Sequence, residues 1–212
     1  MNLKLVRHGE SEANVGAVNP QESGDFRVAL SARGREQARR AGATLGGQWL
    51  RDALIYCSPY RRTRETLDGI LEACELSRND VRIYEDPRLR EVEHGTGDVE
   101  AQEKSRETHG WFYYRFQGGE SPADCFDRTS AFMESMVRQA ERHKSGRVLI
   151  VTHGLTLRCF VMRYLHLTVE QFDTIANPGN AEIVMIGPKE DIPEPLFTSG
   201  RWAVSGLRLR EG

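Results

Sequence analysis

The chain has 212 residues, of which 39% are hydrophobic and 28% are charged, and its formal net charge is −2. This composition predicts one globular domain over residues 1–212, because the chain is too apolar for a disordered protein. The small net charge, and the lack of an apolar run of about 18 residues, argue against nucleic acid or a membrane as a partner.

The cysteines indicate a compartment rather than a site. Cys57, Cys74, Cys125 and Cys159 are far apart and form no C-x-x-C pair, so neither zinc nor redox chemistry is expected of them. The N-terminus shows no cationic head followed by a long apolar stretch, as a secretory signal would. We therefore expect reduced thiols and a cytoplasmic location.

The first third of the chain predicts two strands and two helices. The apolar run 3–6 predicts a strand, the polar segment 15–29 a loop, and Ser31 the N-cap of a helix that continues to Trp49. A second strand, 53–57, ends at Ser58-Pro59. This pair predicts an N-cap followed by proline in the first turn of a helix that runs to about residue 75.

The remaining two thirds repeat this alternation. A strand over 81–84 leads into a charged loop, and Ser121-Pro122-x-Asp124 predicts a capping box for a helix that ends near Lys144. The strand 148–151 is followed by a helix that extends to residue 165. A strand over 182–186 and a Pro-rich surface connection, 188–195, complete the pattern.

Apolar strands that alternate with helices predict an α/β fold, a three-layer sandwich with a mainly parallel sheet and helices on both faces. Three of the predicted strands are followed by arginine or histidine residues. They run into Arg7-His8-Gly9, Ser58-Pro59-x-x-Arg62 and Thr152-His153-Gly154. Ligands bind at the carboxyl ends of parallel strands, where helix N-termini converge, so these residues predict a pocket for an anion.

These residue types favour phosphoryl transfer. A neutral imidazole such as that of His8 can attack phosphorus, and Arg7, Arg62 and His153 would meet the charge on the phosphoryl oxygens. The leaving oxygen needs a proton from a positioned acid. Glu91 and Glu93, in the loop after the third predicted strand, are both candidates.

Four motifs, in the same order, resemble those of the histidine phosphatase (phosphoglycerate mutase-like) superfamily. They are Leu5-Val6-Arg7-His8-Gly9-Glu10-Ser11-x-x-Asn14, Ser58-Pro59-Tyr60-Arg61-Arg62-Thr63-x-x-Thr66, Glu91 four residues before Gly95, and Val151-Thr152-His153-Gly154-x-x-x-Arg158. The resemblance covers residues 1 to about 187 and is closest to small broad-specificity phosphatases of fungi and plants.

The resemblance implies a role for each motif residue. His8 would be the phosphorylated nucleophile, and Arg7, Arg62 and His153 would clamp the phosphate, with Asn14 beside them. Gly154, directly after His153, would belong to the same binding site. Glu91 would be the acid and later the base for water. The expected activity is that of a phosphomonoester hydrolase acting through a phosphohistidine on small phosphorylated metabolites.

Two other functions are considered. A phosphoglycerate mutase shares the fold, but the loop 15–29 does not closely match the loops that shape a mutase pocket. A non-catalytic phospholigand-binding module would need neither His8 nor Glu91. No histidine–carboxylate spacing resembles a metal site, so we predict catalysis without metal or cofactor. A small phosphorylated substrate is the expected partner, and no oligomeric state is predicted.

Overall fold

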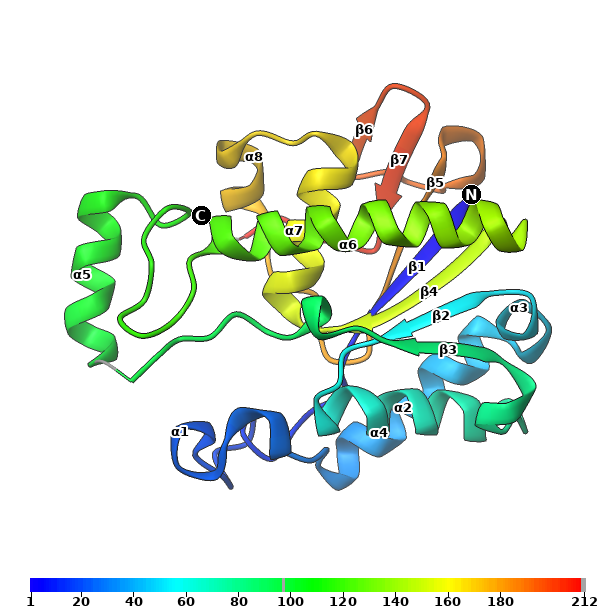
Figure 1. Ribbon diagram of the computed structural model, residues 1–212, viewed down its shortest axis with the longest axis horizontal. Coiled ribbons are helices and arrows are strands. Elements are labelled where there is room, and N and C mark those ends of the chain that lie inside the picture. The colour runs from blue at the N-terminus through cyan, green and yellow to red at the C-terminus, as the bar shows by residue number, and fades with distance from the viewer. Residues whose placement is uncertain (97, 211–212) are drawn as a thin grey trace.

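The computed structural model describes residues 1–96 and 98–210, without the side chains of residues 99 and 100. Its centre is a seven-stranded sheet with the strand order β3-β2-β4-β1-β5-β7-β6 (Figure 1). The strands are β1 (Asn2–Arg7), β2 (Leu54–Cys57), β3 (Arg82–Glu85), β4 (Arg147–Thr152), β5 (Ile183–Pro188), β6 (Phe197–Ser199) and β7 (Trp202–Ser205). The five predicted strands are therefore present, with bounds within two residues of those expected.

The sheet has a parallel core and an antiparallel extension. Strands β3, β2, β4 and β1 are parallel to their neighbours, whereas β5 pairs antiparallel with β1, and β7 and β6 continue that pattern. Helices cover both faces (Figure 1). One face carries α2 (Ala32–Leu45), α3 (Gly47–Arg51) and α4 (Arg61–Glu72); the other carries α6 (Pro122–His143), α7 (Gly154–Leu165) and α8 (Val169–Thr174). The predicted three-layer α/β sandwich is confirmed.

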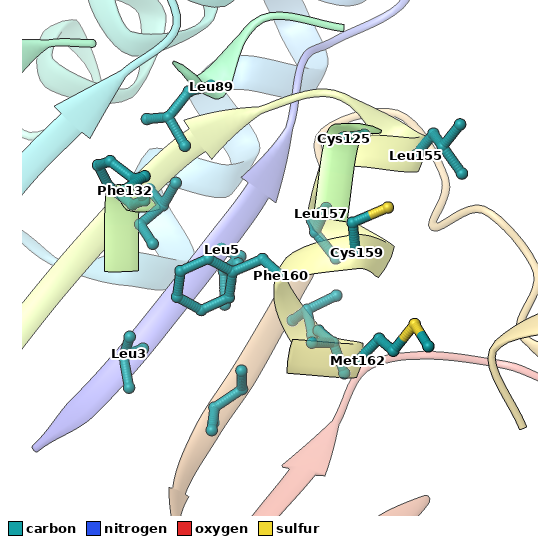
Figure 2. Packing of buried hydrophobic residues seen from close by; sticks show 14 of the residues in the cluster. Leu3, Leu5, Leu89, Cys125, Phe132, Leu155, Leu157, Cys159, Phe160 and Met162 are labelled. Atoms are coloured by element: carbon teal, nitrogen blue, oxygen red, sulfur yellow. The ribbon is translucent and has the colours of Figure 1, made fainter. Parts of the chain in front are cut away.

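The two hydrophobic cores show why β4 is apolar from Val148 to Val151. In β4, Val148 and Ile150 pack toward α6 and α7, whereas Leu149 and Val151 pack toward α2 and α4. Successive side chains of a strand point to opposite faces, so a strand covered on both sides has no polar position. Figure 2 shows the same layer from β1, with Leu5 beside Phe160 of α7.

The register of the parallel strands brings the motif residues together. Arg7 of β1 pairs with Thr152 of β4, and Val151 pairs with Cys57 of β2. The residues that follow, His8, His153 and Ser58, therefore leave the sheet side by side. The short helix α1 (Pro20–Ser23) and α5 (Val99–His109) lie toward this end of the molecule (Figure 1).

Two predicted helix boundaries are wrong. The helix expected to reach Trp49 breaks at Gly46, whose φ of 80° is outside the helical region, so α2 and α3 are separate. The N-cap of α4 is Tyr60 rather than Ser58, and the Ser58 hydroxyl contacts a histidine instead. The caps at Ser31 and Ser121 are confirmed, and each hydroxyl accepts a backbone N–H in the first helical turn.

Five of the described α-helices and strands were not expected from the sequence, among them α8, whose six residues leave little periodicity to detect. Helices α1 and α5 lie in segments interpreted as loops, because neither carries an apolar stripe that periodicity could detect. Strands β6 and β7 form a hairpin around Gly200, after the Pro-rich connection. Both strands are short, which leaves little periodicity to detect. Among the described helices, none combines the length and the apolar character that crossing a bilayer requires.

Candidate active site

A cavity of about 430 Å³ opens where the parallel strands end. Five predicted site residues line it, Arg7, His8, Asn14, Arg62 and Glu91, and so does the alternative acid Glu93. His153 and Gly154 do not line this cavity; both are buried next to it. A larger cavity, about 820 Å³, is lined by none of the predicted site residues and surrounds the amino ends of β1 and β4.

His8 follows β1 directly and continues its ladder, because its N–H donates to the carbonyl of Thr152 over 2.9 Å. The imidazole is 4% exposed, and Nδ1 lies 2.8 Å from the carbonyl oxygen of Gly9. A carbonyl can only accept, so Nδ1 carries the ring proton and Nε2 keeps its lone pair. Burial, followed by the positive charge of Arg62, lowers the pKa of His8 from 6.5 to about 3. The ring is neutral at physiological pH.

Two glycines allow the turn after β1 to lie against the start of α2. A Cβ on Gly9 would be 2.4 Å from the carbonyl oxygen of Gly34, and a Cβ on Gly34 would be 2.0 Å from that of Glu10. The Gly9 N–H donates to the Thr66 hydroxyl of α4 over 3.0 Å. The first two sequence motifs are thus joined through the backbone next to His8.

Arg62 is held by a carboxylate from the segment 15–29. Its Nη1 donates to the Asp25 backbone oxygen over 2.7 Å and to Oδ1 over 2.8 Å, and its Nη2 donates to Oδ2 over 3.1 Å. The Arg62 side chain is 5% exposed. Its guanidinium also lies 5.0 Å from the centre of the Tyr60 ring. Arg62 is therefore fixed from two sides at the wall of the cavity.

Arg7, the last residue of β1, is the second guanidinium of the site. Its Nη1 donates to the Pro178 carbonyl over 2.7 Å, and its buried Nε has no acceptor among the described residues. Burial lowers the pKa of Arg7, while the nearby charge of Glu91 raises it. Two cations from distant parts of the chain thus border the same cavity as His8.

His153 is a buried residue next to the cavity. It is fully buried as the N-cap of α7, and its Nε2 lies 2.8 Å from the Ser58 hydroxyl oxygen. Its ring centre is 5.3 Å from that of His8 and 5.1 Å from that of Tyr60. Burial, followed by the charge of Arg62, holds the pKa of His153 well below 6.5. Gly154 lies beside Arg7, since a Cβ there would be 3.4 Å from Arg7 Nε.

The two candidate acids occupy different environments. The Glu91 carboxylate lies at the N-terminus of α7, where Oε1 accepts from the N–H of Thr156 over 3.3 Å and from its hydroxyl over 3.2 Å. Oε2 accepts from the Leu155 N–H over 3.4 Å. Glu93 is exposed, and within the described residues its carboxylate makes no ion pair. The helix N-terminus positions Glu91, whereas no such contact orients Glu93.

Asn14 combines a turn with a place at the cavity. Its Oδ1 accepts from the N–H and hydroxyl of Ser11, each over 3.0 Å, as in a side-chain-stabilised turn. Asn180 donates to the same oxygen over 3.3 Å and to the carbonyl of His8 over 3.1 Å. Asn14 is therefore both a turn residue and part of the cavity wall.

A family model that matches most of the chain shows the family to which it belongs. The sequence model of the histidine phosphatase superfamily (branch 1) matches residues 3–197. This protein belongs to the histidine phosphatase superfamily. The predicted membership is confirmed.

Relatives of this histidine phosphatase include plant and fungal proteins. The phosphoglycerate mutase-like protein AT74 of Arabidopsis thaliana is 39% identical over 199 residues, 84% of this chain and 62% of that protein. This chain thus spans less than two thirds of the plant protein's length. The broad-range acid phosphatase DET1 of Saccharomyces cerevisiae is 26% identical and is matched over 90% of this chain and 86% of its own length.

A solved structure gives the same picture in three dimensions. Mycobacterial glucosyl-3-phosphoglycerate phosphatase in complex with VO3 superposes with a TM-score of 0.70 and 26% sequence identity. The match covers 97% of each chain. The fold of this histidine phosphatase is therefore shared with a phosphatase over nearly its whole length.

The contacts of the site that were not predicted from the sequence include those of Asp25 with Arg62, of Ser58 with His153, and of Asn180 with the His8 carbonyl. Only the last had a local signal, because Asn177-Pro178-Gly179-Asn180 is a typical turn sequence. The other two join side chains 37 and 95 residues apart.

Proposed function

We propose that this histidine phosphatase is a phosphomonoester hydrolase that forms a phosphohistidine on His8. One observation carries the proposal. A neutral imidazole, with its Nε2 lone pair available, borders the same cavity as two guanidinium groups and a carboxylate. Nucleophile, charge stabilisers and proton donor are the three parts that phosphoryl transfer to a side chain needs.

In the first step, His8 Nε2 attacks phosphorus while the bond from phosphorus to the ester oxygen breaks. Arg7 and Arg62 stabilise the negative charge on the phosphoryl oxygens. Glu91 transfers a proton to the leaving oxygen as that bond breaks, which releases the alcohol. The N-terminus of α7 stabilises the carboxylate that remains.

In the second step, Glu91 takes a proton from water, and the water oxygen attacks phosphorus. The bond between phosphorus and His8 Nε2 breaks, which releases inorganic phosphate and restores the neutral imidazole. His153 acts here from a buried position, where its hydrogen bond with Ser58 fixes its ring against His8. The polar ring of His153 thus lies next to the nucleophile inside the buried layer.

Turnover is expected without a metal ion. Among the described residues, no group of three or more His, Cys, Asp or Glu side chains could hold one. The two arginines supply the positive charge that a divalent cation provides in other phosphatases. Purified protein is expected to hydrolyse p-nitrophenyl phosphate in excess chelator, and an activity that returns only with added metal would contradict this.

The proposed mechanism is tested by trapping the intermediate. Rapid acid-free quenching during turnover of a ³²P-labelled ester should give a protein-bound label that is stable to alkali and lost in acid, as a P–N bond is. Peptide mapping should place the label on His8. A hydrolase that never carries label on His8 would overturn the mechanism, and a protein with no turnover would be a binding module.

A mutase remains the alternative within the family, and a 2,3-bisphosphoglycerate-dependent phosphoglycerate mutase of Parvibaculum lavamentivorans is 33% identical over 191 residues. A mutase returns the phosphoryl group to an acceptor instead of to water. Incubation with 3-phosphoglycerate separates the two, because a hydrolase releases inorganic phosphate whereas a mutase forms 2-phosphoglycerate.

The substrate is proposed to be a small phosphorylated metabolite, and the location to be cytoplasmic. Four cysteines without disulfides support a reducing compartment. The small net charge gives no reason to expect nucleic acid or a membrane surface as a partner. Fractionation of the source cells, with an antibody against the chain, tests the location.

A further inference from the structure

The charge of the cavity wall limits which ester can be bound. Apart from Arg7 and Arg62, the described residues that line the cavity include no lysine or arginine. The rest of the wall consists of small, apolar and uncharged polar residues, the rings of Tyr60 and His94, and the carboxylates of Asp25, Glu91 and Glu93, of which Glu93 is exposed. A leaving group therefore meets one free acid and hydrogen-bonding neighbours such as Gln21 and Thr96.

The two arginines that line the cavity, and the neighbouring Arg90, are already held by other groups. Asp25 occupies both terminal nitrogens of Arg62, and Arg90 pairs with Glu120. Arg7 is bound to a backbone carbonyl and lies beside Glu91. A second phosphate or a carboxylate on the leaving group would thus enter without a free counterion, at a cost that burial increases.

We infer that the substrate is a phosphomonoester of an uncharged or cationic alcohol, and that Glu93 contributes to rejecting a second anion. The inference rests on the proposed hydrolase function. It also favours hydrolysis over the mutase reaction, because 2-phosphoglycerate and 3-phosphoglycerate both carry a carboxylate on the alcohol.

Three esters of equal length test the inference: 2-aminoethyl phosphate, 2-hydroxyethyl phosphate and phosphoglycolate, which differ in the charge of the terminal group. We expect kcat/KM for the hydroxyl ester to exceed that for phosphoglycolate by roughly tenfold or more. The amino ester should be at least as good as the hydroxyl ester. Glu93→Gln should reduce the ratio of hydroxyl to carboxylate ester several-fold, whereas Glu190→Gln, an exposed acid far along the chain, should leave it unchanged.

These experiments distinguish a failure of the inference on substrate charge from a failure of the hydrolase proposal. If the protein hydrolyses p-nitrophenyl phosphate and also prefers phosphoglycolate, the inference on charge is wrong and the hydrolase proposal stands. An unchanged ratio in Glu93→Gln removes Glu93 from the explanation. If no ester, p-nitrophenyl phosphate included, is hydrolysed, the hydrolase proposal itself fails.

A second inference comes from the geometry of Arg62. A guanidinium has five N–H donors, and Asp25 accepts three of them, both on Nη1 and one on Nη2. The two that remain, on Nε and Nη2, point in parallel from the same edge of the group. Parallel donors of this kind match two oxygens of a phosphoryl group.

We propose that Asp25 is a positioning residue that directs this edge of Arg62 toward the phosphoryl group. The segment 15–29 carries Asp25, whereas Arg62 is in the first turn of α4. The contact therefore couples a loop of the cavity rim to the phosphate clamp. Asp25 itself does not touch the reacting atoms.

Orthovanadate, a phosphate analogue, is the probe, with its affinity measured by inhibition and by calorimetric titration. Asp25→Asn is expected to weaken vanadate binding roughly tenfold, which corresponds to about 1.4 kcal/mol. Asp25→Glu, which keeps the charge, should recover part of the loss. Asp68→Asn, which removes an exposed aspartate paired with Arg78, is the matched control and should not change the affinity.

A double-mutant cycle separates positioning from general structural damage. In the Arg62→Ala background, Asp25→Asn should weaken vanadate binding by less than about twofold, because the residue through which it acts is gone. Additive losses in the double mutant would show that Asp25 acts on the fold rather than on Arg62. Tighter binding in Asp25→Asn would show that the carboxylate competes with phosphate, and an unchanged affinity would leave Asp25 without this role.

Discussion

The floor of the cavity consists of Arg7 and His8 at the end of β1 and of Tyr60 and Arg62 after β2, whereas its rim consists of residues from 11–25 and 93–96, with Glu91 between the two. The floor is held by the sheet. His8 extends the β1 ladder onto Thr152, and the Ser58 N–H donates to Val151 over 3.0 Å. A displacement there would break hydrogen bonds in a fully buried layer.

The rim is held by a few side chains. Asp25 joins the segment 15–29 to Arg62, and Gln21 reaches the Gly95 carbonyl over 3.4 Å. The rim residue of each contact, Asp25 or Gln21, is exposed or half-exposed, and such contacts contribute less than fully buried ones. Chemistry should therefore depend on the floor, and substrate choice on the rim.

The largest effect is expected at the floor. Replacement of His8 by Ala removes the attacking nitrogen, so kcat for p-nitrophenyl phosphate should fall by about 10⁴-fold or more. No label should be trapped on the protein. Circular dichroism should show the folded state unchanged, and a variant that keeps its turnover would refute His8 as the nucleophile.

The next effect distinguishes the two acids where floor and rim meet. Glu91→Gln should lower kcat for an alkyl phosphate by about 10²- to 10⁴-fold, because the alkoxide then leaves without a proton. The rate of phosphohistidine formation from p-nitrophenyl phosphate should fall less, since nitrophenolate leaves without protonation. Glu93→Gln should cost less than Glu91→Gln on the alkyl ester; the reverse order would assign the acid to Glu93.

The buried histidines should make the floor sensitive to acid. The pKa of His8 is about 3 in the folded protein and about 6.5 in the unfolded chain. Only the unfolded chain takes up this proton between these values, so stability falls as the pH drops below about 6.5. At pH 4.5 the loss from His8 is roughly 2 to 3 kcal/mol. Urea unfolding at pH 7.5 and 4.5 should show a smaller difference in His8→Gln than in the native chain.

A smaller effect is expected at the support of His153. Ser58→Ala leaves the buried Nε2 of His153 without its partner, which should lower the free energy of unfolding by about 1 to 3 kcal/mol. Ser58→Thr keeps the hydroxyl and is the matched variant. Equal stability of the alanine variant and the native chain in urea would mean that this hydrogen bond contributes nothing.

The smallest effect is expected at the rim. Gln21→Ala removes a long hydrogen bond between α1 and the loop at Gly95, so KM should rise by roughly two- to threefold, with a smaller change in kcat. Steady-state kinetics with 2-hydroxyethyl phosphate measure both constants. A loss in kcat as large as that of Glu91→Gln would show that the rim takes part in the chemistry.

The sequence predicted the sheet better than its surroundings. The apolar runs of β1, interrupted only by Lys4, and of β4 are local signals, so the sequence predicts both strands to within a residue or two. Helix α5 was missed because its residues carry no apolar stripe, and β6 because it has only three residues. The N-cap of α4 was placed wrongly because Ser58 had a competing partner, His153, that is 95 residues away in the chain.

The sequence by itself predicted the nucleophile, the two arginines and the pair of candidate acids, and the strand ends at which they lie. Strand periodicity and the residues that follow each strand are local properties, and the rule that ligands meet the carboxyl ends of parallel strands extends them to a shared edge. Only the tertiary structure decided how each group is held: Nδ1 of His8 on Gly9, Arg62 on Asp25, and Glu91 at the start of α7. Apart from the first, these partners are distant in sequence. They meet because a buried polar group without a hydrogen-bond partner is energetically costly, so the fold brings a partner to each.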